Sequence, residues 1–222
     1  MLLYYITDRR QFSGDEREKK LQLLDKIAQC AVAGVDYIQL REKDLTAREL
    51  QELAKAAARL IPADAITRLL INSRIDVALA CGINGVHLPA NDLPASEARA
   101  LFGKAGHINP TIGVSSHKVE EVAQAEAHGA DFAVFGPVFE KNGQLNPSGV
   151  ELLKRACNRP HVADNPMPVL ALGGITIDNV EQCLEAGAAG IAAVRLFQQN
   201  DVQEIVMVLR NKSKSLKHGG KE

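Results

Sequence analysis

The pattern of apolar and polar residues repeats along this chain. Four times an amphipathic stretch ends at a glycine, a small or polar residue follows, and a short apolar run begins; these glycines are Gly34, Gly82, Gly129 and Gly187. Glycine ends helices because it enters the left-handed backbone region without steric cost. The apolar runs have the length and composition of buried parallel strands. The repeat therefore predicts alternating helices and parallel strands.

Eight such apolar runs occur, and a helical pattern follows each of them. The predicted strands are 2–7, 37–40, 68–72, 85–88, 111–114, 132–136, 168–172 and 190–194. The predicted helices lie near 18–33, 46–61, 75–81, 95–103, 118–128, 149–159, 178–186 and 202–216. Thr46 and Glu49 form a predicted capping box, and Asp178 and Ser96 are candidate N-caps.

Eight strand–helix units predict an α/β fold, a single (β/α)8 TIM barrel. We expect one domain over residues 1–216 and a disordered polar tail over 217–222. A doubly wound open sheet is the alternative, but no Gly-x-Gly-x-x-Gly motif follows the first predicted strand.

Composition narrows the functional classes. The net charge of the 222-residue chain is −1, and only 4% of its residues are aromatic, which gives no reason to expect a nucleic-acid partner. No apolar run is long enough to span a bilayer, and the N-terminus lacks the features of a signal peptide. The 4 cysteines form no Cys-x-x-Cys pair and are typical of small buried residues in a reducing compartment. We therefore expect a cytoplasmic protein without a membrane partner.

Polar residues collect where the predicted strands end. In this fold the chemistry lies at the C-terminal ends of strands and in the loops that follow them. Those positions hold Thr7, Asp8, Gln39, Arg41–Asp44, Asn72–Arg74, His87, Asn91, Asp92, Ser115–His117, Gly136, Gly173, Gly174 and Arg195. Gln39, Arg41 and Lys43 are two residues apart, so in an extended chain they point the same way and form a donor row suited to phosphate oxygens. The alternative is a solvated charge cluster that begins a loop.

Three further positions each have a functional and a structural interpretation. Gly173 and Gly174 follow a predicted strand and resemble a phosphate cradle, although tight turns also use paired glycines. Asp92 is a candidate Mg²⁺ ligand, or else a turn or cap residue. His117 is a candidate general acid or base, or else an N-cap or packing residue at the start of a helix. For His87, which lies between apolar residues, we favour a hydrogen-bonded core histidine.

Taken together, the motifs of this chain resemble those of the thiamine-phosphate synthase superfamily, which includes a thiazole tautomerase branch. The motifs are YITD (5–8), IQLREKD (38–44), LLINSRIDVALACGINGVHLPANDLP (69–94), IGVSSH (112–117), GADFAVFGPVF (129–139), LALGGIT (170–176) and AGAAGIAAV (186–194). As a set they cover nearly the whole chain.

The resemblance implies an enzyme that couples an aminopyrimidine methyl diphosphate to a thiazole phosphate and releases pyrophosphate with Mg²⁺ assistance. It implies small phosphorylated substrates and leaves a homodimer possible. Its motifs assign the pyrimidine and diphosphate to Gln39, Arg41, Lys43 and Asn72, and Mg²⁺ to Asp92. They also assign a diphosphate contact to Ser115, and the thiazole phosphate to Gly173, Gly174 and the backbone near Val194 and Arg195.

The chain departs from the usual synthase pattern in three places. Ser73 replaces a carboxylate expected to bind Mg²⁺, the usual Thr-rich loop is replaced by residues 140–149 with Lys141 as a candidate cation, and Arg195-Leu196 replaces a Ser-Ala pair. One alternative is therefore a tautomerase that isomerises a thiazole phosphate carboxylate with His117 as acid and base. A regulator that binds a phosphate ligand without turnover is the other.

Overall fold

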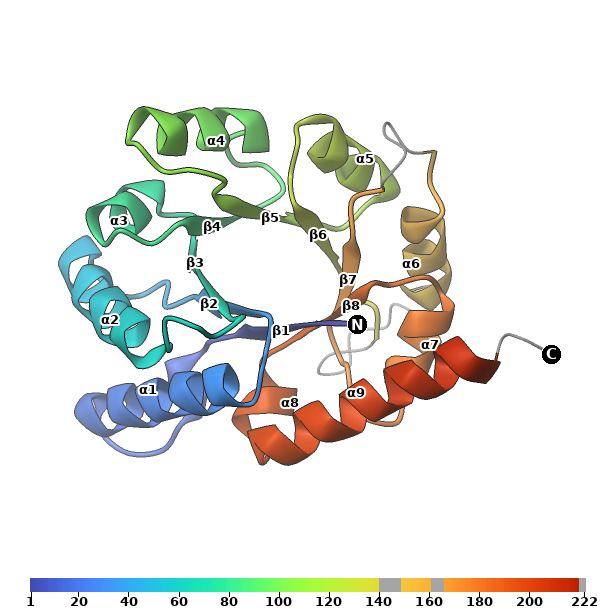
Figure 1. Cartoon of the computed structure of the whole chain (residues 1–222), viewed down its shortest axis with the longest axis horizontal. Coiled ribbons are helices and arrows are strands. Elements are labelled where there is room, and N and C mark those ends of the chain that lie inside the picture. The colour runs from blue at the N-terminus through green and yellow to red at the C-terminus, as the bar shows by residue number, and fades with distance from the viewer. Residues whose placement is uncertain (140–148, 161–165, 220–222) are drawn as a thin grey trace.

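The computed structural model describes residues 1–139, 149–160 and 166–219. Its strands form a closed parallel barrel in sequence order, as Figure 1 shows. The strands are β1 (Leu2–Ile6), β2 (Tyr37–Leu40), β3 (Arg68–Asn72), β4 (Gly85–Leu88), β5 (Thr111–Ser116), β6 (Phe132–Phe135), β7 (Val169–Leu172) and β8 (Gly190–Ala193). Pairing of β1 with β8 closes the sheet. The predicted (β/α)8 barrel is confirmed, and the closure rules out the open doubly wound sheet.

Helices surround this barrel (Figure 1). They are η1 (Arg9–Gln11), α1 (Glu16–Val32), α2 (Ala47–Leu60), α3 (Ile75–Ala80), α4 (Ala95–Lys104), α5 (Val119–Ala127), α6 (Gly149–Cys157), α7 (Val180–Glu185), α8 (Arg195–Gln198) and α9 (Val202–Gly219). The sequence pattern did not predict α8. Residues 220–222 of the expected tail lie outside the described residues, and α9 continues past the predicted end at 216.

Two apolar clusters make up the core. The larger one lies between strands and helices, and the smaller one combines Tyr4, Ile6, Leu70, Phe132, Val134, Leu170 and Ala192 from five strands. In the smaller cluster Tyr4 and Phe132 meet edge to face at 5.4 Å between ring centroids, and Tyr37 stacks on Phe132 at 4.7 Å. Side chains thus fill the interior of the barrel, as is usual for eight strands, so ligands have access only at the strand ends.

Helix starts follow local capping chemistry. Asp15 and Glu18 form a reciprocal capping box, so α1 begins at Glu16, two residues before the predicted start. The capping box of Thr46 and Glu49 at the start of α2 is confirmed.

The predicted N-caps Ser96 and Asp178 are wrong. Pro94 precedes the first residue of α4, and Ser96 lies inside that helix. Asn179 precedes α7, but its amide oxygen accepts from the Thr176 backbone N at 2.8 Å instead of capping the helix. In both places a neighbouring residue takes the N-cap position without a side-chain capping hydrogen bond.

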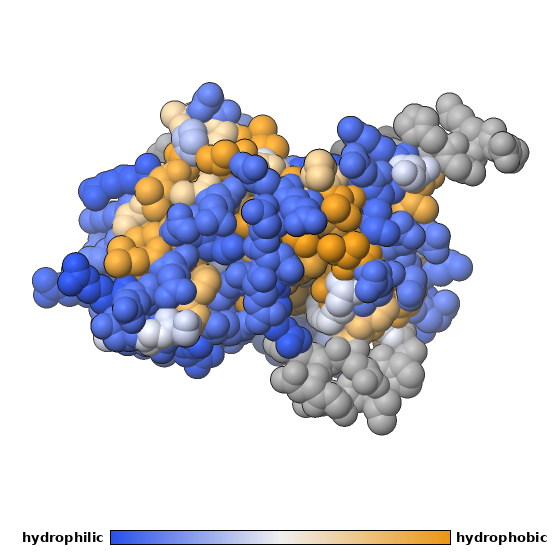
Figure 2. Space-filling model, turned by 90° about the horizontal axis from the view of Figure 1, so that it is seen from below, coloured by the Kyte–Doolittle hydropathy of each residue, from blue (hydrophilic) through white to orange (hydrophobic). Residues whose placement is uncertain are grey.

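Apolar side chains remain exposed on the face shown in Figure 2, where orange patches alternate with hydrophilic ones. Val32 of α1 and Met207 of α9 are among the exposed apolar residues of the described part of the chain. All four cysteines are free; Cys30 and Cys183 are buried. Across residues 1–139, 149–160 and 166–219, no helix combines the length and apolar character that a bilayer crossing requires.

Candidate functional site

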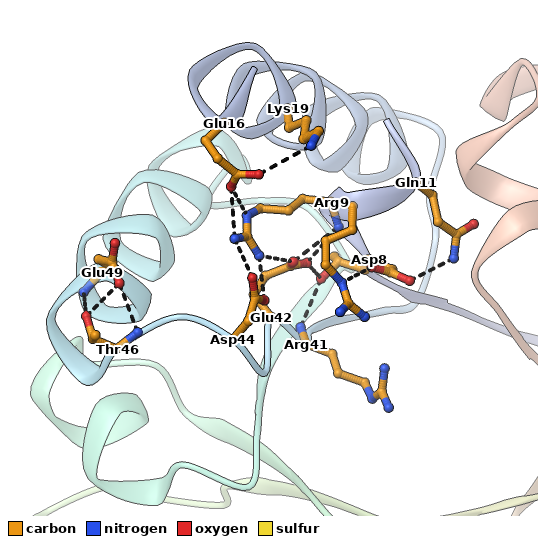
Figure 3. A network of polar contacts seen from close by, with 12 residues as sticks. Asp8, Arg9, Gln11, Glu16, Lys19, Arg41, Glu42, Asp44, Thr46 and Glu49 are labelled. Atoms are coloured by element: carbon orange, nitrogen blue, oxygen red, sulfur yellow. Dashed lines mark hydrogen bonds and ion pairs between the residues drawn. The ribbon is translucent and has the colours of Figure 1, made fainter. Parts of the chain in front are cut away.

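One buried arginine organises the loop that follows β2. Arg9, at the start of η1, donates from Nη1 to Glu42 Oε2 at 3.1 Å and binds both oxygens of Asp44 at 2.8 and 2.7 Å (Figure 3). Its Nη2 also lies 2.9 Å from Glu16 Oε2 on α1. The side chains of Arg9 and Glu42 are only 4% and 1% exposed. Glu42 and Asp44, the acidic residues of the REKD string, therefore have a structural role as partners of Arg9.

Glu42 is also anchored to β1. It accepts hydrogen bonds from Thr7 Oγ1 at 2.6 Å and from the Arg9 backbone N at 3.1 Å. Thr7 Oγ1 in turn accepts from the Arg41 backbone N at 2.9 Å. Burial raises the pKa of Glu42, against the opposing effect of these donors, whereas the Arg9 hydrogen bonds lower the pKa of Asp44 to about 2. The backbone on both sides of Arg41 is thereby fixed.

The two cations of the same string remain available to a ligand. Figure 3 shows the Arg41 side chain pointing away from the Arg9 network. Within the described ranges, the structure has no ion pair of Arg41 or Lys43, and Lys43 lines a cavity of about 270 Å³ with Asn72 and Ser73. In the loop that follows β2, the string is therefore divided into structural carboxylates and cations without an ion pair among the described residues.

Amide and hydroxyl groups continue the polar row across β2 and β3. Gln39 Nε2 lies 3.5 Å from Asn72 Oδ1, and Asn72 Nδ2 donates to Ser73 Oγ at 3.2 Å. Ser73 has a φ of 59°, a left-handed conformation in which Asn and Asp are the favoured non-glycine residues. Its hydroxyl supplies a neutral oxygen where the resemblance expects a carboxylate.

The buried histidine on β4 links the barrel interior to the row. His87 Nδ1 lies 3.1 Å from the Tyr4 hydroxyl, and Nε2 lies 2.8 Å from Ser115 Oγ on β5. Burial first, and then the charge of Arg41, lower the pKa of His87 to about 3. The prediction of a hydrogen-bonded core histidine is confirmed, and the ring is neutral at physiological pH.

Asp92 and His117 lie at exposed positions. Asp92 Oδ1 accepts from the Leu93 backbone N at 2.8 Å, and Asp92 and Ser115 are among the residues that line a small cavity. His117 is 60% exposed, with Nδ1 3.5 Å from Glu121 Oε2. Because Lys118 precedes α5, His117 is not its N-cap. The described residues contain no group of three or more His, Cys, Asp or Glu able to hold a metal.

A second polar region lies between the ends of β7 and β8. It is a cavity of about 650 Å³ whose lining includes Gly173, Gly174, Val194 and Arg195. Gly173 has a φ of +100°, and a Cβ there would lie 2.8 Å from Pro137 Cα, so only glycine fits this backbone. Val194 precedes α8, which starts at the exposed Arg195. Lys141, the candidate cation of the loop after β6, lies outside the described residues.

Sequence reasoning did not find the roles of Arg9, Thr7 and α8. The Arg9–Glu42 contact joins residues 33 positions apart, which no local pattern reveals. Thr7 of the YITD motif was placed at a strand end, but its hydrogen bonds to Glu42 and to the Arg41 backbone were not predicted. Helix α8 has only 4 residues, too few for a helical period to show.

A family model, two curated relatives and a solved structure all point to the same family. Residues 3–197 match the family described as thiamine monophosphate synthase. A putative thiamine-phosphate synthase of Geobacter sulfurreducens is 44% identical over 195 residues, which are 86% of this chain and 84% of that protein. The thiamine-phosphate synthase of Halalkalibacterium halodurans is 37% identical over 86% of this chain and 85% of that protein. The solved thiamine phosphate pyrophosphorylase from Pyrococcus furiosus has a TM-score of 0.76 and 29% identity, with 96% of each chain covered.

Proposed function

The chain belongs to the thiamine monophosphate synthase family, and on this premise we propose that it is a thiamine-phosphate synthase. In the proposed reaction an aminopyrimidine methyl diphosphate and a thiazole phosphate form thiamine phosphate and pyrophosphate. The observation that carries the proposal is the presence of two polar regions at the strand ends of one barrel. Lys43 lines one region, two residues after Arg41 in the chain, and the glycine turn and Arg195 line the other. Two phosphorylated substrates require two such regions.

The first region suits a leaving diphosphate. When the bond between the pyrimidine methylene carbon and the diphosphate oxygen breaks, the electron pair leaves with the diphosphate, which gains negative charge. Preorganised cations stabilise that charge without reorganising during the step. Arg41 provides two parallel donors and Lys43 a point charge, and the Arg9 network holds their backbone in place. We assign the pyrimidine to Gln39 and Asn72.

The second region suits the phosphate of the nucleophile. Gly173 and Gly174 allow close approach of an anion to the backbone, and the phosphate site of TIM barrels is usual after strands seven and eight, near a short extra helix. Arg195 adds a side-chain cation beside Val194. Binding there would hold the thiazole nitrogen near the methylene carbon, so that its lone pair forms the new C–N bond.

We propose that Mg²⁺ binds together with the diphosphate. Mg²⁺ in phosphate sites commonly takes one or two carboxylates, with substrate oxygens and waters completing its octahedron. Asp92 offers an exposed carboxylate, of which only Oδ1 accepts the Leu93 N–H, and Ser73 offers a hydroxyl. Asp92 would hold the ion, which would neutralise charge on the leaving diphosphate. Mg²⁺ dependence, the cytoplasmic location and a homodimer stay predictions.

The test is product formation from the aminopyrimidine methyl diphosphate and the aromatic thiazole phosphate, with and without Mg²⁺. Arg41→Ala should lower kcat/KM by roughly 10²–10³-fold, because it removes a donor to the developing charge. Arg48→Ala is the matched control, since the Arg48 side chain is 88% exposed on α2. It should retain wild-type activity.

The other interpretations would give different results in the same assay. Absence of product from folded wild-type protein would refute the synthase proposal. The non-aromatic thiazole isomer would then be the next substrate, because turnover of it that is lost in His117→Ala would indicate a tautomerase. Binding of phosphate ligands without turnover of either substrate would indicate a regulator.

A further inference from the structure

Three side chains form a hydrogen-bonded path from the barrel interior to the site. The Tyr4 hydroxyl lies 3.1 Å from His87 Nδ1, and His87 Nε2 lies 2.8 Å from Ser115 Oγ. Tyr4 and His87 are buried, whereas Ser115 is half-buried and lines a cavity with Asp92. The path therefore joins the packed interior to Ser115, the residue to which the family motifs assign a diphosphate contact.

The protons on this path have two possible arrangements. A neutral imidazole has one N–H, so one ring nitrogen donates and the other accepts. In the described part of the chain, the Tyr4 hydroxyl has His87 Nδ1 as its hydrogen-bond partner, and the rings of Tyr37 and Phe132 pack edge-on against Tyr4. A proton on Nδ1 would leave the phenol hydrogen buried without an acceptor, which is unfavourable in an apolar interior.

In the favourable arrangement of protons, the Tyr4 hydroxyl is the donor to His87. Burial raises the pKa of Tyr4 well above its usual value, so Tyr4 keeps its proton and donates to Nδ1. His87, whose pKa burial lowers to about 3, is neutral and carries its single proton on Nε2. That N–H donates to Ser115 Oγ. The hydroxyl hydrogen of Ser115 is then free to point elsewhere.

We infer that His87 is a positioning residue, whose Nε2–H holds Ser115 so that its hydroxyl donates to an anionic diphosphate oxygen. In the opposite tautomer Ser115 would donate to His87 and present only lone pairs to the anion. The inference rests on the proposed function, because that function makes a diphosphate the ligand of this region.

The glycine next to His87 on the neighbouring strand leaves space for the imidazole ring. Gly113 on β5 is the register partner of His87 on β4. A Cβ at Gly113 would lie 2.8 Å from His87 Nδ1 and 2.5 Å from Phe132 Cζ, closer than such atoms approach one another. The position of the imidazole between Tyr4 and Ser115 therefore requires glycine on the neighbouring strand.

Nitrogen NMR of ¹⁵N-histidine-labelled protein tests the tautomer directly. The signal of His87 is assigned by its loss in His87→Gln. We expect the proton of His87 on Nε2, with no titration between pH 5.5 and 8. Tyr4→Phe should shift the signal toward a mixture of tautomers, because the donor to Nδ1 is gone. A wild-type proton on Nδ1 would overturn the inference.

Binding of inorganic pyrophosphate in the presence of Mg²⁺, measured by calorimetry, tests the consequence. His87→Leu should weaken binding roughly tenfold or more, since a hydrogen bond to a charged group is lost. His87→Gln should restore most of the affinity, because the amide N–H can replace Nε2–H. In a Ser115→Ala background, His87→Leu should cause little further loss. His107→Leu, at a half-buried histidine near Asn84, is the control and should bind normally.

The outcomes separate this inference from the proposed function. Equal losses in His87→Leu and His87→Gln, or an undiminished loss in the Ser115→Ala background, would indicate a merely structural histidine and overturn the inference. If His87→Leu does not fold, the wild-type and Tyr4→Phe spectra still decide the tautomer. Absence of condensation activity, with the expected spectra and pyrophosphate affinities, would refute the proposed function and leave the role of His87 intact.

Discussion

Replacing Arg9 by Met should strongly destabilise the barrel. The Arg9 side chain is 4% exposed and contacts Glu42, Asp44 and Glu16. Glu42, only 1% exposed, would then be a buried carboxylate without its cation. Breaking a buried pair by removing one partner costs about 3–5 kcal/mol. For a domain of this size, that loss lowers Tm by roughly 6–20 °C.

The loss should depend on pH in a defined direction. Burial already raises the pKa of Glu42, and without Arg9 it rises further. A carboxyl whose folded pKa exceeds its unfolded pKa opposes folding increasingly as the pH rises from the unfolded value to the folded value, and fully above the folded value. The opposition disappears below the unfolded value of about 4.3. The variant should therefore be less destabilised at pH 5 than at pH 7.

Urea unfolding followed by circular dichroism at both pH values measures this effect. Arg10→Met is the control, because the Arg10 side chain is 64% exposed and has one 3.4 Å contact with Asp8. It should change the free energy of unfolding by about 0.5 kcal/mol or less. Arg9→Met combined with Glu42→Gln should recover part of the loss. Equal stability of the Arg9 and Arg10 variants, or an Arg9→Met loss unchanged by pH or by Glu42→Gln, would refute the reasoning.

Three further predictions follow from single positions. Because the pKa of His87 falls to about 3 on folding, wild-type stability should decrease by up to about 1.4 kcal/mol per pH unit as pH falls from 6 to 4, and unfolding of His87→Gln should lack that contribution. Gly173→Ala, at φ +100° and with its Cβ 2.8 Å from Pro137, should cost roughly 1–3 kcal/mol by thermal unfolding and raise KM for the thiazole phosphate. Ser73→Asp, at a φ of 59° that Asp tolerates, should lower the Mg²⁺ concentration needed for half-maximal synthesis, as a Mg²⁺ titration would measure.

Most of the fold could be predicted because each strand and helix leaves a local pattern. A buried parallel strand appears as a short apolar run, and a helix end appears as a glycine, as at Gly34 and Gly129. The start of α1 could not be read from periodicity, because its first turn is polar. The capping box of Asp15 and Glu18 would have indicated the start of α1.

The site was predictable only where a local spacing indicates it. The two-residue spacing of Gln39, Arg41 and Lys43 predicted a donor row, but β2 ends at Leu40, and the contacts of Arg9 with Glu42 hold the loop that follows. Arg9 could not be predicted as the partner of Glu42, because a contact between residues that are distant in sequence depends on the closed barrel. The tautomer of His87 likewise depends on a hydroxyl from another strand.

The two regions of the site use different chemical groups, and this difference bears on the departures from the usual synthase sequence. In the proposed first region side chains are the donors, so Ser73 in place of a carboxylate would change the ligand set directly. In the proposed second region the donors would be backbone N–H groups of the glycine turn and the start of α8, which Arg195 in place of a small residue would not remove. Sequence divergence should therefore alter metal dependence before it alters binding of the thiazole phosphate.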